Sequence, residues 1–157
     1  NSRLCGCPLR STSSSRSNES IKMTAVIASS KAKPLAEQWK GEITSGRHQY
    51  FCDEPEKLEG HDQGPAPYDL LTGSLAACTL ITLRMYAKHK GYDFGEYSVE
   101  IDFHTNREHE EHIERRIVFK ELPNEELQQK ILTICSKTPV TKTLLRSLDI
   151  HTVLVTA

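Results

Sequence analysis

Hydrophobic and polar residues alternate with a period of two in the second half of the chain. One segment has apolar side chains at every second position, namely Tyr97, Val99, Ile101 and Phe103. After a polar turn, the alternation returns at Ile113, Ile117 and Phe119. Because successive side chains of a strand point to opposite faces, this pattern predicts two strands that each bury one face.

Further strands are predicted on either side of this pair. Residues 39–44 and 47–53 flank Ser45-Gly46 and are predicted to form a hairpin with a tight turn. The next stretch, residues 54–67, contains three prolines and two glycines and is predicted to be a loop. Residues 150–155 are predicted to form a final strand. Together with three predicted helices, these strands predict an α+β fold.

Three helices are predicted. The first begins after Pro67 and ends at Gly91, which follows a lysine-rich turn as a C-terminal cap should. The second begins after Asn124, a favourable N-cap that precedes two glutamates. A proline after Thr138 starts the third helix, which is expected to extend through Leu148.

The length of the chain predicts one domain. A chain of 157 residues is long enough for a single hydrophobic core and too short to suggest two. Residues 1–22 are rich in Ser and Arg and poor in large apolar side chains, so they are predicted to be a disordered extension. Such a leader also resembles an organelle transit peptide. The domain is assigned to residues 23–157.

Charge and cysteine content restrict the partners and the compartment. The chain has 20 basic and 21 acidic residues mixed along its length, so neither nucleic acid nor a membrane surface is an expected partner. The longest apolar run, residues 70–83, is shorter than the roughly 20 residues of a membrane span and is interpreted as part of a core helix. Five widely spaced cysteines do not suggest a secreted disulfide framework, and a cytoplasmic location is expected.

Cys78 is the main candidate for chemistry. It shares a face of the first helix with Leu71, Leu75 and Met85, so we expect it to point into the core. A buried cysteine is often only a small apolar side chain. A reactive thiol must form the thiolate, which apolar surroundings disfavour, so it needs a cation brought from elsewhere in the fold.

The predicted cation is Arg47, which follows the hairpin turn; alternatively, it is a solvated strand residue. Tyr68 and Asp69 open the Cys78 helix and could hold such an arginine by hydrogen bonds. Asp69 could equally act only on the helix dipole.

No cofactor or metal site is predicted. The sequence contains no glycine-rich phosphate loop, Ser/His/Asp arrangement or dinucleotide motif. His104, His109 and His112 lie near a predicted hairpin tip and could suggest zinc. Strand positions three apart point to opposite faces, so these imidazoles are expected to be solvated and to bind no metal.

The central segment contains GPAPYDLLTGSLAACT, followed by TLRMYAKHKG. It resembles the central helix of the OsmC/Ohr family of thiol peroxidases. SGR at 45–47 resembles its arginine-bearing turn, and TPVTKTLL at 138–145 resembles its second cysteine helix. The resemblance implies curved antiparallel sheets wrapped on central helices in an intertwined homodimer. It also implies a peroxidatic cysteine at Cys78 and a thiolate-stabilising arginine at Arg47.

The sequence departs from the family pattern at two positions. Thr138 stands where the family has its resolving cysteine, and Tyr68 stands where the hydroperoxidase branch has a glutamate that pairs with the arginine. Cys135, about one helical turn before Thr138, is either a substitute resolving cysteine or a core residue. If it does not resolve the sulfenic acid, an external thiol or dithiol must do so.

The sequence therefore predicts a thiol-dependent peroxidase that reduces organic hydroperoxides through Cys78. Arg47 and Cys135 are the other candidate catalytic residues, and Tyr68, Asp69 and Thr138 are candidate substrate-binding residues. The alternative is a catalytically weak OsmC-like dimer that acts as a small-molecule-binding or thiol-sensing protein.

Overall fold

The computed structural model describes residues 25–146 and 148–156. The strand β1 (Ser30–Pro34) pairs antiparallel with β2 (Gly41–Ser45), which pairs with β3 (His48–Cys52). A separate antiparallel hairpin consists of β4 (Tyr97–His104) and β5 (His112–Phe119). The helices are α1 (Pro67–Lys90), α2 (Glu125–Cys135) and α3 (Pro139–Leu144). The short 3-10 helix η1 (Glu56–Leu58) interrupts the loop before α1.

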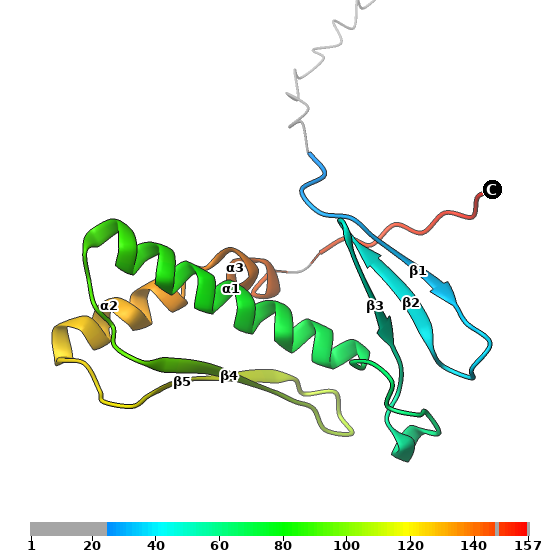
Figure 1. Cartoon of the computed structure of the whole chain (residues 1–157), viewed down its shortest axis with the longest axis horizontal. Coiled ribbons are helices and arrows are strands. Elements are labelled where there is room, and N and C mark those ends of the chain that lie inside the picture. Colours follow the sequence, from blue (N-terminus) through cyan, green and yellow to red (C-terminus); the bar gives the residue numbers. More distant parts are fainter. Residues whose placement is uncertain (1–24, 147, 157) are drawn as a thin grey trace, which may run out of the picture.

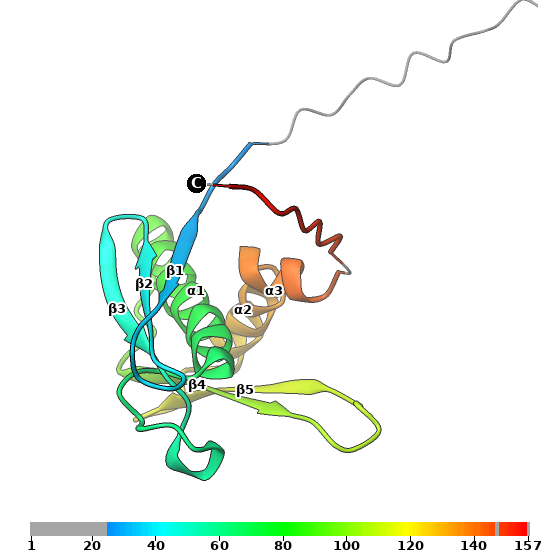
Figure 2. The ribbon, with the colours of Figure 1, turned by 90° about the vertical axis from the view of Figure 1, so that its right-hand side faces the viewer.

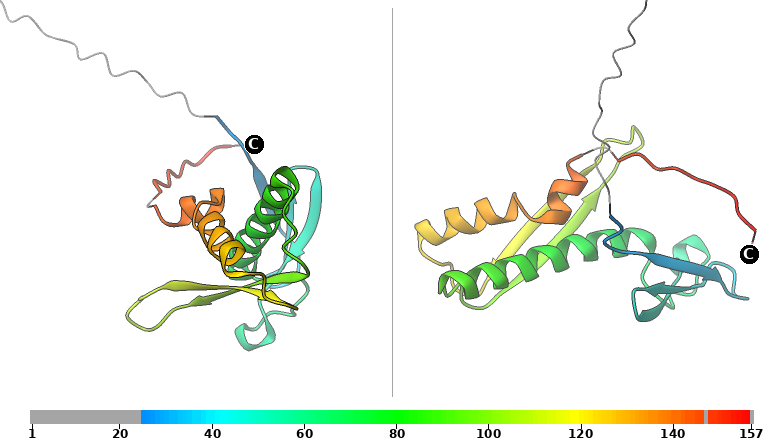
Figure 3. Two further views of the ribbon diagram at one scale, coloured as in Figure 1. Left: turned by 90° about the vertical axis from the view of Figure 1, so that its left-hand side faces the viewer. Right: turned by 90° about the horizontal axis from the view of Figure 1, so that it is seen from above.

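Two layers form the main body. In Figure 1, α1 lies along the β4–β5 ribbon, and the end-on view of Figure 2 shows α2 and α3 beside α1 on the same face of that ribbon. The three-stranded sheet lies near the N-terminal end of α1, as the view from above in Figure 3 also shows. The predicted α+β class is therefore correct.

The core lies between the C-terminal half of α1 and α2. Its buried side chains come from both helices and from the turn between α1 and β4, and they are Leu83, Phe94, Ile131, Ile134 and Cys135. On α1 the buried positions are Leu75, Thr79 and Leu83, four residues apart. The expected stripe is thus wrong at Met85, which is 68% exposed. Leu75 belongs to both faces, but the buried stripe continues through Thr79 and Leu83 rather than through Cys78 and Met85.

Local sequence signals define the ends of the helices. Gly91 caps α1 with φ 70°, the left-handed conformation that favours glycine. The side chain of Asn124 accepts a hydrogen bond of 3.0 Å from the Leu127 N–H at the start of α2. Both caps were predicted. Asp69 in the first turn of α1 accepts a hydrogen bond from the Ala66 N–H at 2.9 Å, which is a structural capping role.

Asp53 organises the loop that leads into α1. Its carboxylate is buried and accepts hydrogen bonds from the backbone N–H groups of Glu54, His61 and Gln63 at 2.9, 3.1 and 3.3 Å. Burial by itself raises the pKa of this carboxyl, but the three N–H donors outweigh it and lower the pKa below its ordinary value. At Gly64, a Cβ atom would collide with the carbonyl of Phe51, so the loop requires glycine there.

The predicted elements differ from the structure in three places. The strand β1 was not predicted. Residues 150–155, predicted as a strand, are exposed and without regular structure, because no strand of the described chain lies beside them to pair with their backbone groups. The third helix ends at Leu144 rather than at Leu148. Residues 1–22, predicted to be disordered, lie outside the described residues.

By length and composition alone, α1 could cross a membrane. Within the described chain it instead packs against β4, α2 and α3, which together cover one of its faces. The opposite face carries exposed apolar side chains, including Ile81 and Met85. The interpretation of residues 70–83 as part of a buried core helix therefore holds for one face only.

Candidate active site

Cys78 lies in the middle of α1, at the edge of its buried face. The thiol is half-buried and belongs to no disulfide. The next residue, Thr79, is fully buried, and its hydroxyl donates a hydrogen bond of 2.8 Å to the Leu75 carbonyl. This bond within the helix leaves the Thr79 oxygen free to accept a hydrogen bond from a neighbouring element.

The donor to Thr79 is Arg115 of β5. Its Nη1 donates to the hydroxyl oxygens of Thr79 at 3.1 Å and Thr141 at 2.9 Å, and its Nη2 donates to the carbonyl of Cys135 at 2.9 Å. Arg115 therefore connects β5 with α1, α2 and α3. It forms no ion pair with any residue that the structure describes, so its positive charge is not neutralised by a carboxylate there.

Thr138 extends this network at the start of α3. Its hydroxyl lies 2.6 Å from that of Thr141, and the residue is 0% exposed. Thr138 is the N-cap residue of α3, as predicted, but its side chain makes no capping hydrogen bond. The position that resembles the second cysteine of the family thus holds a buried hydroxyl, which cannot form a disulfide.

Cys135 is a core residue in this chain. It is 4% exposed and packs with Leu83 and Phe94. Burial raises the pKa of the Cys135 thiol, and the nearby positive charge of Arg115 acts in the opposite direction with a smaller effect. A buried thiol with a raised pKa is a poor nucleophile at neutral pH.

The described chain does not bring Arg47 to Cys78. Arg47 lies at the exposed turn between β2 and β3 and forms no hydrogen bond or ion pair within residues 25–146 and 148–156. Its predicted role would require another copy of the chain. Tyr68 and Asp69 hold no arginine either: Tyr68 stacks on Phe103, with ring centroids 4.7 Å apart.

Arg115 was missed in the sequence analysis, although the sequence contains a signal for it. It lies midway between Ile113 and Ile117, the two apolar positions that define the buried face of β5. With a period of two, Arg115 shares their face. A charged residue on a buried face requires partners, and this requirement alone makes it a candidate functional residue.

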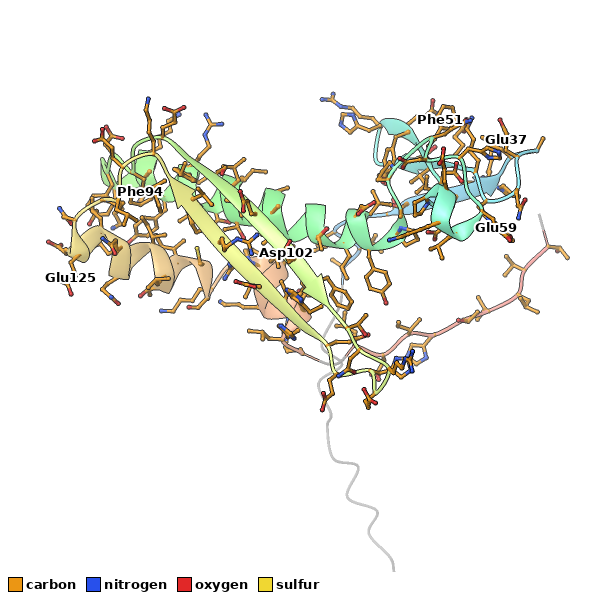
Figure 4. All side chains as sticks on the ribbon, turned by 90° about the horizontal axis from the view of Figure 1, so that it is seen from below. Glu37, Phe51, Glu59, Phe94, Asp102 and Glu125 are labelled. Atoms are coloured by element: carbon orange, nitrogen blue, oxygen red, sulfur yellow. The ribbon has the colours of Figure 1, made fainter. Side chains whose placement is uncertain are left out.

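The histidines near the hairpin tip are exposed, as expected, but two of them form a pair that was not expected. His104 and His112 are cross-strand partners, and their rings stack with centroids 4.6 Å apart. Ligand atoms of Asp102, His104 and Glu114 lie within 4.8 Å of one another. Figure 4 views this exposed face and labels Asp102 on it. Arg116 forms ion pairs with Asp102 and Glu114 at 2.6 and 3.6 Å, so its guanidinium already balances the charge of these carboxylates.

The fold and these side chains define an α+β protein with a thiol halfway along its central helix, one residue before a threonine that accepts a hydrogen bond from Arg115. The chain belongs to the OsmC-like protein family, whose model matches residues 60–153, more than half of the sequence. No curated protein matches it. The OsmC/Ohr resemblance seen in the sequence is confirmed.

Solved structures share the fold. The OsmC-like protein of Mycoplasma pneumoniae has a TM-score of 0.60 and 20% identity over 78% of this chain and 89% of that chain. An organic hydroperoxide resistance protein OsmC of Legionella pneumophila has a TM-score of 0.57 and 16% identity over 78% and 91%. The organic hydroperoxide resistance protein OhrB of Bacillus subtilis has a TM-score of 0.51 and 20% identity over 75% and 90%. At these identities the likeness concerns the fold.

Proposed function

We propose that this protein is a thiol-dependent peroxidase that reduces organic hydroperoxides through Cys78. The observation that carries the proposal is the position of Cys78: half-buried on the central helix, directly before the threonine that binds Arg115. Through Thr79, the position next to Cys78 is bound to a cation that has no carboxylate partner among the described residues. The proposal is supported further by family membership and by relatives named organic hydroperoxide resistance proteins.

The first step is attack of the Cys78 thiolate on an oxygen of the hydroperoxide. A sulfur–oxygen bond forms while the O–O bond breaks, and the departing alkoxide takes up a proton to give the alcohol. The sulfur is oxidised to a sulfenic acid and the peroxide is reduced. Arg115 is the proposed source of positive charge for this step. Arg47 stays a predicted second cation, supplied by another copy of the chain.

The second step is reduction of the sulfenic acid by an external thiol. The thiol condenses with it and releases water, and a further thiol reduces the mixed disulfide to regenerate Cys78. Cys135 is less suited to this step because it is buried and its pKa is raised. Thr138 cannot replace it. External thiols or dithiols of this kind are abundant in the reducing cytoplasm, which is the proposed compartment.

The proposed active form is a homodimer. The uncovered face of α1 includes Ile81 and Met85, which are 55% and 68% exposed, and an apolar face of this kind favours burial against another surface. Residues 148–156 present an unpaired apolar segment that could pair with a strand of a second copy. The same arrangement would allow Arg47 to act across the dimer.

Turnover of cumene hydroperoxide with dithiothreitol as reductant tests the proposal. We expect the wild-type protein and Cys135→Ser to consume the peroxide at similar rates and Cys78→Ser to show only the rate of dithiothreitol alone. Size-exclusion chromatography of each variant verifies that folding and assembly are retained. Equal turnover by Cys78→Ser and the wild type would refute the role of Cys78.

A second candidate function is favoured by one observation, the threonine at position 138. A family member without a resolving cysteine could serve as a dimeric binding or thiol-sensing protein. In that case Cys78 would be oxidised once by peroxide, and dithiothreitol would not support repeated turnover.

A further inference from the structure

A cleft lies beside the Arg115 network, between the first turns of α1, the β4–β5 hairpin and α3. Its volume is about 820 Å³, within the range that holds small organic ligands. Most of its wall is apolar and includes Leu71, Leu75 and Phe103. Tyr68 stacks on Phe103 and extends this wall. The cleft therefore suits the apolar part of a ligand.

One cation lines this cleft. Arg115 has five N–H donors, of which two on Nη1 and one on Nη2 are used by Thr79, Thr141 and the Cys135 carbonyl. The Nε–H and one Nη2–H have no acceptor among the described side chains and backbone groups. Because three hydrogen bonds to three helices hold the guanidinium, little conformational freedom is lost when it binds a further acceptor.

The two ends of the cleft differ in charge. Glu111 lines it near the hairpin tip, and Arg115 lies four residues further along, or roughly 13 Å at strand spacing. An anionic group is therefore attracted to the Arg115 end and repelled from the Glu111 end. With a single cation and two remaining donors, this end matches a carboxylate better than a doubly charged phosphate.

We propose that this cleft binds an amphipathic monocarboxylate, with its anionic head at Arg115 and its apolar chain along Leu71 and Leu75. Cys78 is not among the residues that line the cleft, so binding requires no chemistry at the thiol. The proposal thus goes beyond peroxide reduction and can hold or fail independently of it.

Calorimetric titration of the full chain with octanoate and octan-1-ol tests the proposal. The two probes share an apolar chain and differ in the charge of the head group. We expect octanoate to bind at least about tenfold more tightly than octan-1-ol, which is the effect of a charge-assisted hydrogen bond. Cys78→Ser should bind octanoate as the wild type does. Equal affinity for the two probes, or no binding because a second copy closes the cleft, would overturn the proposal.

Two variants of β5 provide a matched comparison. Arg115→Gln should lose the preference for octanoate, whereas Arg116→Gln, which removes the neighbouring charge from the opposite face, should keep it. If Arg115→Gln fails to fold, Arg115→Lys preserves the charge and should keep part of the preference. The comparison of octanoate with octan-1-ol on the wild-type protein then still tests the proposal. Loss of the preference in Arg116→Gln alone would contradict the assignment to Arg115.

Discussion

Cys78 and Cys135 lie on neighbouring helices, yet their side chains differ in exposure, which controls access to a thiol. Cys78 is half-buried and lies on the side of α1 that the described chain leaves partly open, whereas Cys135 is 4% exposed and packs among apolar side chains. Arg115 binds the Cys135 carbonyl and the hydroxyl of Thr79, the residue after Cys78. At Cys135, however, burial has the larger effect and raises the pKa. The comparison indicates that exposure, more than proximity to the cation, distinguishes the two thiols.

The largest change is expected when a thiol is introduced into the Arg115 network at position 138. Thr138→Cys restores the residue that the family resemblance implies at this position. Treatment with one equivalent of peroxide should convert the variant from a protein without an internal disulfide into one with a disulfide to Cys78. Peptide mass spectrometry under non-reducing conditions detects this product. Thr138→Ser is the control, and a disulfide to Cys135 instead would reverse the ranking of the two native thiols.

A second expected contrast is alkylation of the native protein. Iodoacetamide should label Cys78 about a hundredfold faster than Cys135, because a core thiol reacts only after local opening of the fold. Site-resolved mass spectrometry measures both rates, and the unfolded protein in guanidinium provides the reference in which they should converge. Similar rates at the two sites in the native protein would remove the basis of the comparison.

The contribution of Arg115 to Cys78 is expected to be smaller. Arg115→Gln should slow oxidation of Cys78 by about tenfold, which corresponds to about 1.4 kcal/mol of lost electrostatic stabilisation. Arg116→Gln should leave the rate unchanged, since Arg116 is neutralised by Asp102 and Glu100 on the other face of the hairpin. The pH dependence of the rate distinguishes an effect on the thiolate from a loss of folding. An unchanged pH profile in Arg115→Gln would exclude Arg115 as the stabilising cation.

The smallest expected effect concerns stability at alkaline pH. The pKa of Cys135 is raised in the folded state, so the neutral thiol contributes stability fully below the unfolded thiol pKa of about 8.5, and this contribution is lost as pH rises through the folded pKa. Urea unfolding across this range should show a decline that Cys135→Ala reduces and Cys78→Ser preserves. A decline of equal size in Cys135→Ala would assign it to another group, such as Tyr97, whose pKa is also raised by burial.

Local signals predicted much of the fold. Pro67 and Gly91 gave the ends of α1, alternation gave β4, and Asn124 gave the start of α2. These features depend on residues within a few positions of one another. The prediction missed the strand β1 and wrongly assigned a strand to residues 150–155. Strand formation depends on a neighbour that is distant in the sequence or belongs to another copy.

The candidate site was predictable in part. Cys78 could be selected from its sequence context, but its neighbours come from elements far away in the chain. Arg115 reaches Thr79 across 36 positions and Thr141 across 26. Periodicity places Arg115 on a buried face but does not identify which helices cover that face. Arg47 was selected from its position after the hairpin turn and from the family resemblance, and within the described chain it lies at an exposed turn.

The most direct test of the central claim treats the fully reduced protein with one equivalent of cumene hydroperoxide and locates the oxidised residue by peptide mass spectrometry. We predict rapid formation of a sulfenic acid at Cys78, trapped by dimedone, together with one equivalent of the alcohol and no modification of Cys135. Cys78→Ser should yield no alcohol. Oxidation at Cys135 with Cys78 intact, or no oxidation at either thiol, would contradict the account.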